Sequence, residues 1–338
     1  MKAVVLEGPK RAVLAEVPEP GSPGEDEILL DVRRIGLCGS DLNSYRGRNP
    51  LVTYPRILGH EIAATVAVVN PKHPEWTVGT AVTVSPYTSC GRCASCLRGR
   101  PNACQFNQTL GVQRDGALTE RIAVPVSRLY RADLSLKELC LVEPLTVGFH
   151  AVARGRVEPG EYVAVFGCGG VGLGAVAGAA FRGASVIGLD MDDSKLATAR
   201  KAGAAHTINV SANDLHAKLS ELTNGRGPDV VIEAIGLPQT FRAAVEEVAF
   251  TGRVVYIGYA KEEVSYETRH FVQKELDILG SRNAQPENFR EVIRMLEAHQ
   301  FPVDDAITHT ISIEETPDLL AAWDREPAHF GKIMIEVK

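Results

Sequence analysis

The sequence predicts an α/β fold in which a doubly wound parallel sheet accompanies a second, mainly β domain. A glycine-rich turn joins a buried strand to a helix of small residues at 161–193. Strands then alternate with helix-like stretches up to residue 286, whereas residues 1–145 hold short strands, turns and little helix. The length of 338 residues also fits roughly two domains.

The mainly β domain occupies the start of the chain and takes in its C-terminal tail. MKAVVLEGPK at the N-terminus indicates a short strand and turn and lacks the apolar core of a signal peptide. Turn-forming stretches at 18–27 (PEPGSPGEDE) and 70–76 (NPKHPEW) separate further short strands. After Pro286 we expect a helix over 287–299, a helix-like run over 318–326 and a closing strand over 332–337.

The parallel sheet begins with VAVF at 163–166, followed by Gly167, Gly169 and Gly172 in the pattern G-x-G-x-x-G. The first glycine permits a tight turn, the second lets a pyrophosphate approach the helix N-terminus, and the third allows close helix–strand packing. A second strand, SVIGLD, ends in Asp190. A strand before the glycines, a helix after them and an acid at this spacing together predict a dinucleotide site.

The acids after the second strand favour NAD over NADP. Asp190 is placed to accept hydrogen bonds from ribose hydroxyls, and Asp192 and Asp193 add negative charge where a 2′-phosphate would lie. Alternatively these acids cap the next helix, a role we expect for Asp193. Lys195 offers a cation nearby.

Four more strands continue the alternation and bring the predicted sheet to six. They are HTINV (206–210), DVVIEAIG (229–236), RVVYIGYA (253–260) and ELDILGSR (275–282).

Composition indicates a soluble protein that acts on small molecules. Hydrophobic residues make up 45% and charged residues 23% of the chain, and the net charge is −6 without a long basic run. We therefore expect neither nucleic acid nor a membrane surface as a partner. The longest apolar stretch is interrupted by Arg182, which argues against a membrane span. The expected location is the cytoplasm.

Four of the seven cysteines fall within residues 90–104, as C-x2-C-x2-C-x7-C. Two-residue gaps let the thiolates converge on one tetrahedral zinc, and Gly91 and Gly99 permit the tight turns. Disulfides are disfavoured because nothing signals secretion, and an iron–sulfur cluster because no proline follows the last cysteine. Four thiolates close the coordination sphere, so this zinc would be structural. The ligands would be Cys90, Cys93, Cys96 and Cys104.

Three further stretches carry residue types that ligate zinc. They contain Cys38, then His60 with Glu61, and then Glu143 inside an apolar run. Each has a structural alternative: Cys38 as a small core residue, His60 as a hydrogen-bonded surface histidine, and Glu143 as a salt-bridged or capping acid. Spacing alone does not join them.

With these motifs in view, the whole chain resembles the zinc-dependent medium-chain dehydrogenases, above all their sorbitol/polyol and sugar-acid branch. The resemblance is carried by C-G-S-D at 38–41, G-H-E at 59–61, the cysteine cluster, V-E-P-L-T-V-G at 142–148 and the glycine fingerprint. Segments 45–61 and 279–289 look most like bacterial hexonate dehydrogenases such as those of L-galactonate. It implies a Rossmann NAD-binding domain at 148–286, a GroES-like catalytic zinc domain at 1–147 and 287–338, and a homotetramer or dimer.

The resemblance also implies roles for individual residues. Cys38, His60 and Glu143 would hold a catalytic zinc, with Glu61 supporting them or alternating as a ligand. Ser40 would pass on the proton of the alcohol. Many relatives have a histidine five residues after the zinc cysteine, but Asn43 stands there, so the proton would leave through water. The implied cofactor-binding residues are Gly167, Gly169, Gly170, Val171, Gly172, Asp190, Lys195, Ile257 and Ser281, and the implied substrate-binding residues are Arg114 and Arg282.

The expected activity is oxidation of a secondary alcohol of a sugar acid or polyol to the ketone, with NAD and two zinc ions per chain. The alternatives are an L-threonine 3-dehydrogenase or another zinc alcohol dehydrogenase. A zinc-free reductase of the same superfamily would lack the cysteine cluster and the ligand residues. A non-catalytic NAD-binding protein would hold a single zinc.

Overall fold

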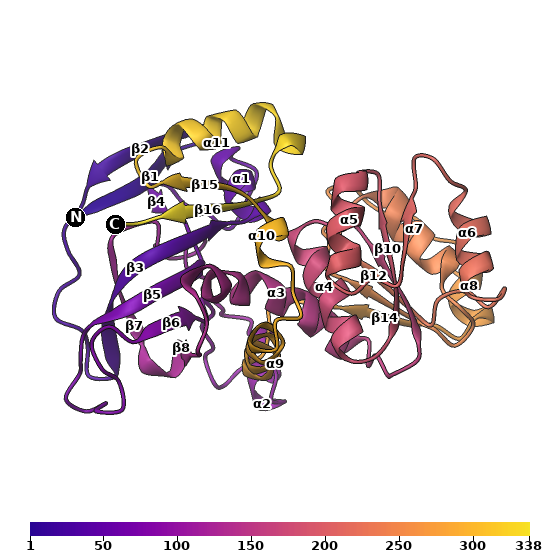
Figure 1. Ribbon diagram of the computed structural model, residues 1–338, viewed down its shortest axis with the longest axis horizontal. Coiled ribbons are helices and arrows are strands. Elements are labelled where there is room, and N and C mark those ends of the chain that lie inside the picture. Colours follow the sequence, from indigo (N-terminus) through magenta and orange to yellow (C-terminus); the bar gives the residue numbers. More distant parts are fainter. The chain divides into compact units, whose positions relative to one another are not determined.

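The structure is a computed structural model that describes residues 1–338, and it divides into two compact units (Figure 1). The β unit comprises Met1–Glu143 and Val303–Lys338, and the α/β unit comprises Pro144–Pro302. Helix α3 (Leu136–Arg154) carries the chain from one unit to the other, and Pro144 lies inside it. No helix is long and apolar enough to cross a membrane.

The α/β unit contains the predicted doubly wound sheet. Its six strands are all parallel and lie in the order β11-β10-β9-β12-β13-β14, so the strand order reverses between β9 and β12. All six predicted strands are therefore confirmed. The strands are β9 (Tyr162–Phe166), β10 (Ser185–Asp190), β11 (His206–Asn209), β12 (Val230–Glu233), β13 (Arg253–Tyr256) and β14 (Asp277–Gly280). The helices are α4 (Gly170–Phe181), α5 (Asp193–Lys201), α6 (Leu215–Leu222), α7 (Pro238–Glu247), α8 (Arg269–Gln273) and α9 (Pro286–Glu297).

Small residues let the second half of α3 pack directly on α4. A Cβ on Gly148 would lie 2.1 Å from the backbone nitrogen of Ala175, and one on Gly174 would lie 2.7 Å from the carbonyl oxygen of Leu145. Side chains at these positions would force the helices apart. The glycine that closes the V-E-P-L-T-V-G motif is thus explained by helix packing.

The β unit is built from antiparallel strands, with one parallel pair at its edge. One sheet has the order β2-β1-β4, and the other has the order β15-β16-β3-β5-β6-β8, with β7 paired to β3. The C-terminal strand β16 pairs with β3, which confirms that the tail completes this domain. The strands are β1 (Lys2–Gly8), β2 (Arg11–Glu16), β3 (Glu27–Leu37), β4 (Arg56–Ile57), β5 (Glu61–Val68), β6 (Ala81–Val84), β7 (Arg121–Pro125), β8 (Leu129–Arg131), β15 (Ile307–Ser312) and β16 (Lys332–Glu336). The short helices are α1 (Gly39–Tyr45), α2 (Ala94–Leu97), α10 (Val303–Ala306) and α11 (Thr316–Arg325), with 3-10 turns η1 (Pro101–Ala103), η2 (Val126–Arg128) and η3 (Pro327–His329).

The unit boundaries differ from the predicted ones, which fell after residues 147 and 286. Residues 287–302, assigned from sequence to the first domain, lie in the α/β unit because α9 packs there. Asn288 of α9 lies 3.1 Å from Nδ1 of the buried His150, and Glu291 pairs with Arg182 at 2.9 Å. A helical pattern does not reveal which unit its apolar face covers.

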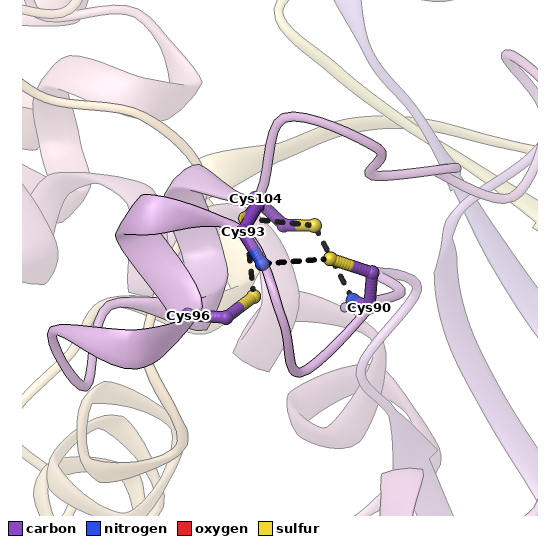
Figure 2. Close-up of side chains that lie close together, drawn as sticks. All are labelled: Cys90, Cys93, Cys96 and Cys104. Carbon is purple, nitrogen blue, oxygen red and sulfur yellow. Dashed lines mark hydrogen bonds between the residues drawn. The ribbon is translucent and has the colours of Figure 1, made fainter.

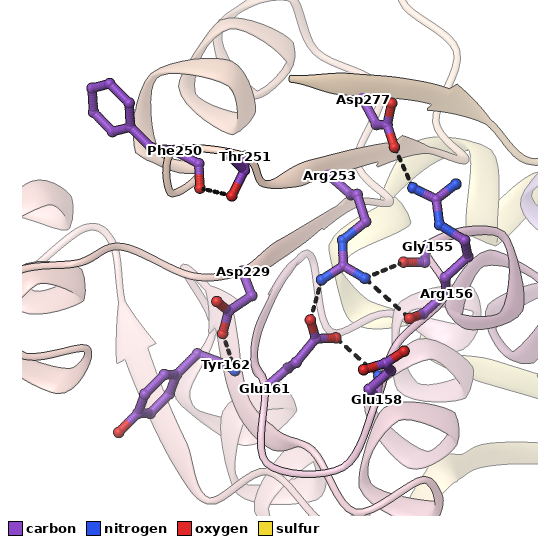
Figure 3. A network of polar contacts seen from close by, with 10 residues as sticks. All are labelled: Gly155, Arg156, Glu158, Glu161, Tyr162, Asp229, Phe250, Thr251, Arg253 and Asp277. Carbon is purple, nitrogen blue, oxygen red and sulfur yellow. Dashed lines mark hydrogen bonds and ion pairs between the residues drawn. The ribbon is translucent and has the colours of Figure 1, made fainter. Parts of the chain in front are cut away.

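A polar network fastens the amino edge of the parallel sheet (Figure 3). Arg253, at the start of β13, donates to the carbonyls of Gly155 and Arg156 at 3.0 Å each and pairs with Glu161. Arg156 in turn pairs with Asp277 at the start of β14. These contacts occupy the edge opposite the glycine turn, so the carboxyl edge is the one left for a ligand.

Candidate metal and nucleotide sites

The four clustered cysteines converge around α2 and η1 in the β unit (Figure 2). Their sulfur atoms all lie within 4.8 Å of one another, and none forms a disulfide. The Sγ atom of Cys93 is 3.5 Å from that of Cys96 and 3.8 Å from that of Cys104, well beyond a sulfur–sulfur bond of about 2.05 Å. Gly91 and Gly99 adopt φ of 71° and 69°, as the predicted turns require. This arrangement fits one tetrahedral metal ion.

Hydrogen bonds favour the charged form of part of this cluster. The Ser95 hydroxyl and nearby backbone N–H groups lower the pKa of Cys93 to about 5, and the backbone of Arg92 lowers the pKa of Cys90. Burial and the neighbouring Cys93 raise the pKa of Cys96 to about 11. Thiolates are the form that a cation requires, so two of the four ligands are favoured in that form by the fold alone.

A second cluster brings together Cys38, His60 and Glu61, whose ligand atoms lie within 4.8 Å of one another. Cys38 immediately precedes α1, and Glu61 is the first residue of β5. Gly59, with φ of 96°, turns the chain just before His60. His60 and Glu61 are buried, whereas Cys38 is partly exposed. Thiol, imidazole and carboxylate in one place form a donor set suited to zinc.

Asp41 supports His60 within this cluster. One carboxylate oxygen accepts from the backbone N–H of Cys38 at 2.9 Å, and the other lies 3.8 Å from Nδ1 of His60. Burial raises the pKa of Asp41. Burial alone would lower the pKa of His60, but Asp41 and Cys38 raise it well above its usual value. An acid that faces one nitrogen of a histidine leaves the other for a metal.

Glu61 is accommodated by Gly36 and paired with Lys332. Gly36 of β3 faces Glu61 of β5, and a Cβ there would lie 1.9 Å from a Glu61 carboxylate oxygen. Lys332, the first residue of β16, pairs with the same oxygen and donates to the carbonyl of Leu37 at 3.2 Å. Burial is the largest single influence on the pKa of Lys332 and lowers it, but Glu61, Cys38 and Cys140 together raise it, so the net shift is upward.

Glu143 is buried but lies outside the group of three. Its Oε1 accepts a hydrogen bond from the hydroxyl of Tyr87, which is also buried. Burial is the main cause that raises the pKa of Glu143 to about 7; His60 acts in the opposite direction. His60 and Glu61 both act on Glu143 electrostatically, which places it beside the cluster.

The sequence did not single out Asp41, Tyr87, Lys332 or Gly36. Only Asp41 had a local signal, its place in the C-G-S-D motif. Strand register sets the contacts of Lys332 and Gly36, and register is not readable from one sequence. Tyr87 reaches Glu143 of α3 from the loop after β6, 56 residues away in the chain.

Two further arginines of the β unit pair with acidic side chains. Arg46 pairs with Asp324 at 2.6 Å, and Arg56 pairs with Asp115 at 3.0 Å. Nε of Arg56 and Nε of the partly buried Arg114 are each buried without a hydrogen-bond partner.

The glycine turn of the α/β unit has the form that a dinucleotide requires. Gly167 adopts φ of 94°, and a Cβ on Gly172 would lie 1.8 Å from the Gly167 carbonyl oxygen. Nothing lies within 4 Å of a Cβ built on Gly169 or Gly170, at the N-terminus of α4. These two glycines therefore leave open space beside the helix N-terminus, where a pyrophosphate fits.

Asp190 is held at the end of β10 by backbone groups. Its carboxylate accepts from the N–H groups of Cys168 at 2.9 Å and Met191 at 2.8 Å. The expected cap of α5 was wrong: Asp192 is the N-cap and accepts from the Ser194 N–H at 2.8 Å.

The remaining cofactor candidates lie at or near the carboxyl edge of the same sheet. Ile257 and Ser281 directly follow β13 and β14, and the Ser281 hydroxyl is buried without a hydrogen-bond partner. Lys195 lies in the first turn of α5, and the exposed Arg282 follows Ser281. Val171 lies in the first turn of α4.

Comparison with known proteins decides the family. The alcohol dehydrogenase GroES-like domain matches residues 24–133, and the zinc-binding dehydrogenase domain matches residues 170–298. An uncharacterized zinc-type alcohol dehydrogenase-like protein of Haemophilus influenzae is 36% identical over 98% of both chains. L-galactonate-5-dehydrogenase of Escherichia coli is 33% identical over 91% of both chains, and sorbitol dehydrogenase of Bacillus subtilis is 34% identical over 95% of this chain and 92% of its own. The chain belongs to the zinc-dependent medium-chain dehydrogenases.

Solved structures extend the comparison to the fold of the dehydrogenase. An alcohol dehydrogenase from Escherichia coli CFT073 in complex with NADH has a TM-score of 0.91 and 29% identity, covering 100% of this chain and 99% of the other. A zinc-binding dehydrogenase from Sinorhizobium meliloti 1021 bound to NADP has a TM-score of 0.92 and 30% identity over 99% of both chains. The dehydrogenase is therefore an oxidoreductase that acts on alcohol groups, with the predicted Rossmann-like and GroES-like domains.

Proposed function

We propose that the dehydrogenase oxidises a secondary hydroxyl of a polyol or sugar acid to the ketone, with zinc and NAD. The convergence of Cys38, His60 and Glu61 beside the buried Glu143 carries this proposal. The sorbitol and L-galactonate enzymes among its relatives support the substrate class. The overall reaction is balanced: the alcohol loses a hydride to NAD and a proton to solvent.

Cys38, His60 and Glu143 would hold the catalytic zinc, with Glu61 as the supporting or alternating acid. When bound, zinc lowers the pKa of a coordinated alcohol, and NAD accepts the hydride. Asp41 would help to orient the His60 ring through its charge, 3.8 Å from Nδ1, and Lys332 compensates the charge of the buried Glu61. Ser40, in the first turn of α1, would pass the proton outward; because Asn43 does not titrate, water would complete the path.

Asp190 supports NAD as the cofactor. A carboxylate at the end of β10 suits ribose hydroxyls and repels a 2′-phosphate, and Asp192 adds charge of the same sign. The measurement is NADH against NADPH formation at matched concentrations. A kcat/KM with NADP equal to or above that with NAD would contradict the assignment.

Arg114 supports a carboxylated substrate. Gly116, two residues on, packs so closely on the turn before His60 that a Cβ would lie 2.4 Å from the Gly59 carbonyl. Burial and Arg128 lower the pKa of Arg114, and Glu27 opposes them only in part. We expect Arg114→Met to raise KM for a hexonate and leave KM for an uncharged polyol unchanged. Equal effects on both substrates would remove Arg114 from substrate binding, and Arg282 is then the next residue to test.

The first experiment measures NADH formation with NAD against hexonates, polyols and L-threonine, with and without a chelator. Chelator-sensitive turnover of a hexonate or polyol is the expected result. Turnover of L-threonine alone would favour the threonine 3-dehydrogenase alternative. No turnover in protein that carries two zinc ions would exclude these substrate classes. The homo-oligomeric state and cytoplasmic location stay predictions.

A further inference from the structure

We propose that Tyr87 is a positioning residue for the inner metal site and that it acts through the carboxylate of Glu143. This inference rests on the proposed role of Glu143 as a zinc ligand. The phenol of Tyr87 donates to Oε1 of Glu143, and 5% of the Tyr87 residue surface is exposed. The contact therefore forms away from bulk water, where a hydrogen bond to a carboxylate is strong.

A carboxylate has two oxygens that can compete for one metal ion. With Oε1 held by the phenol, the other carboxylate oxygen would be the one presented to a metal, and the side chain loses much of its freedom to rotate. Removing a residue that hydrogen-bonds to a metal-ligating side chain typically lowers metal affinity or activity about 10- to 100-fold. The phenol also gives a hydrogen-bond partner to an acid that is buried.

The segment that carries Tyr87 is itself fixed, so its hydroxyl is delivered to a defined place. It joins β6 to the cysteine cluster, and its backbone is bonded on both sides of Tyr87. The N–H of Leu110 donates to the Pro86 carbonyl at 3.1 Å, and the N–H of Thr88 donates to Oδ1 of Asn107 at 3.1 Å. Leu110 and Asn107, which make these contacts, both follow Cys104 in the chain. The folded cysteine cluster thus helps to hold the residue that holds Glu143.

Tyr87→Phe removes one hydroxyl and keeps the ring. The matched control is Tyr54→Phe, because the Tyr54 hydroxyl also donates to a carbonyl of the β unit, that of Ser44, at 2.7 Å. Zinc affinity of each site is measured by titration with a competing chelator, and the inner site is also loaded with Co²⁺ for its visible absorption. Retention of the outer zinc reports that the variant is folded.

We expect Tyr87→Phe to weaken zinc binding at the inner site about 10- to 100-fold and to shift the Co²⁺ bands, with the outer site unchanged. Tyr54→Phe should change neither. In a Glu143→Ala background, Tyr87→Phe should change inner-site affinity less than twofold, because its target is gone.

Two results would overturn the inference. One is an inner-site affinity in Tyr87→Phe within twofold of the parent, with unchanged Co²⁺ bands. The other is an equal loss with and without Glu143, which would show that Tyr87 does not act through that carboxylate. If Glu143→Ala itself leaves inner-site affinity unchanged, the ligand assignment in the proposed function fails, and that failure is distinct from either result.

Discussion

The buried pair of Lys332 and Glu61 gives the sharpest prediction for the β unit. Lys332→Met keeps the length and apolar stem of the side chain but removes its charge. In the dehydrogenase the two side chains are only 8% and 1% exposed, and the Lys332 ammonium also donates to the Leu37 carbonyl. The substitution would leave a buried carboxylate without its cation.

The magnitude follows from this burial. Removing one partner of a buried ion pair costs about 3–5 kcal/mol, because the remaining charge stays desolvated. Solvent screening is small at these exposures, so only protonation of Glu61 or a bound metal reduces the cost. We expect Lys332→Met to lower the unfolding free energy of the zinc-loaded β unit by about 3 kcal/mol. The double variant with Glu61→Gln should lose about 2 kcal/mol less than the sum of the single losses.

The pH dependence has a definite sign. The pKa of Lys332 lies above the ordinary lysine value of 10.5, because Glu61, Cys38 and Cys140 together outweigh burial. The folded state therefore holds this proton more tightly than the unfolded chain does. The contribution of the pair is fully present below pH 10.5 and is lost as the pH rises through the folded-state pKa. The unfolding free energy of Lys332→Met should not show this decrease at alkaline pH.

The assay is denaturant unfolding of the zinc-saturated single and double variants, with each unit followed by its own probe. Proteins of two domains need not unfold in one step, so the β-unit transition has to be separated first. Two results would refute the argument that Lys332 and Glu61 form a coupled buried pair. One is a loss of unfolding free energy in the double variant that equals the sum of the single losses. The other is an unfolding free energy of Lys332→Met that still falls at alkaline pH as it does in the parent.

Four further outcomes follow from the same structure. Cys38→Ser should abolish turnover and remove about one zinc per chain with the fold intact, as metal analysis and circular dichroism would show; retained activity would contradict the assignment. Cys96→Ser should lose the outer zinc and lower the melting temperature, because a closed site contributes folding energy; unchanged thermal stability would argue against it. Gly172→Ala should weaken NAD binding at least tenfold in calorimetry, since its Cβ would clash with the Gly167 carbonyl 1.8 Å away, and an unchanged Kd would count against the cradle. Arg253→Ala should lower the stability of the α/β unit by about 2 kcal/mol without altering the Kd for NAD, because two carbonyls lose their donor; a weaker Kd at unchanged stability would be the opposite result.

The sequence predicted the parallel sheet well because its signals are local. Strands buried on both faces appear as continuous apolar runs, and the glycine turn carries its own steric reasons. Cysteines two residues apart are close in almost any fold, so the outer metal site was also predictable.

Other features depended on contacts between distant segments. α9 has a clear helical pattern, yet only packing shows that it belongs to the α/β unit. Lys332 meets Glu61 because β16 pairs with β3 and β3 pairs with β5, and neither register is written in one sequence. Tyr87 was missed because its partner Glu143 lies 56 residues away, on α3.

These distant contacts also explain why the inner cluster suits a divalent cation. Three carboxylates and one thiolate can carry negative charge here, whereas the groups that can carry positive charge are Lys332, which pairs with Glu61, and His60, whose pKa is raised. Burial of such charge is costly unless it is compensated, and the raised pKa values of Asp41 and Glu143 are one sign of that cost. A divalent cation compensates more of this charge than any single side chain can. The charge balance therefore supports a metal at this cluster independently of the ligand motifs. Lys332 and Tyr87 reduce the cost of burying these acids, Lys332 by its charge beside Glu61 and Tyr87 by its hydrogen bond to Glu143.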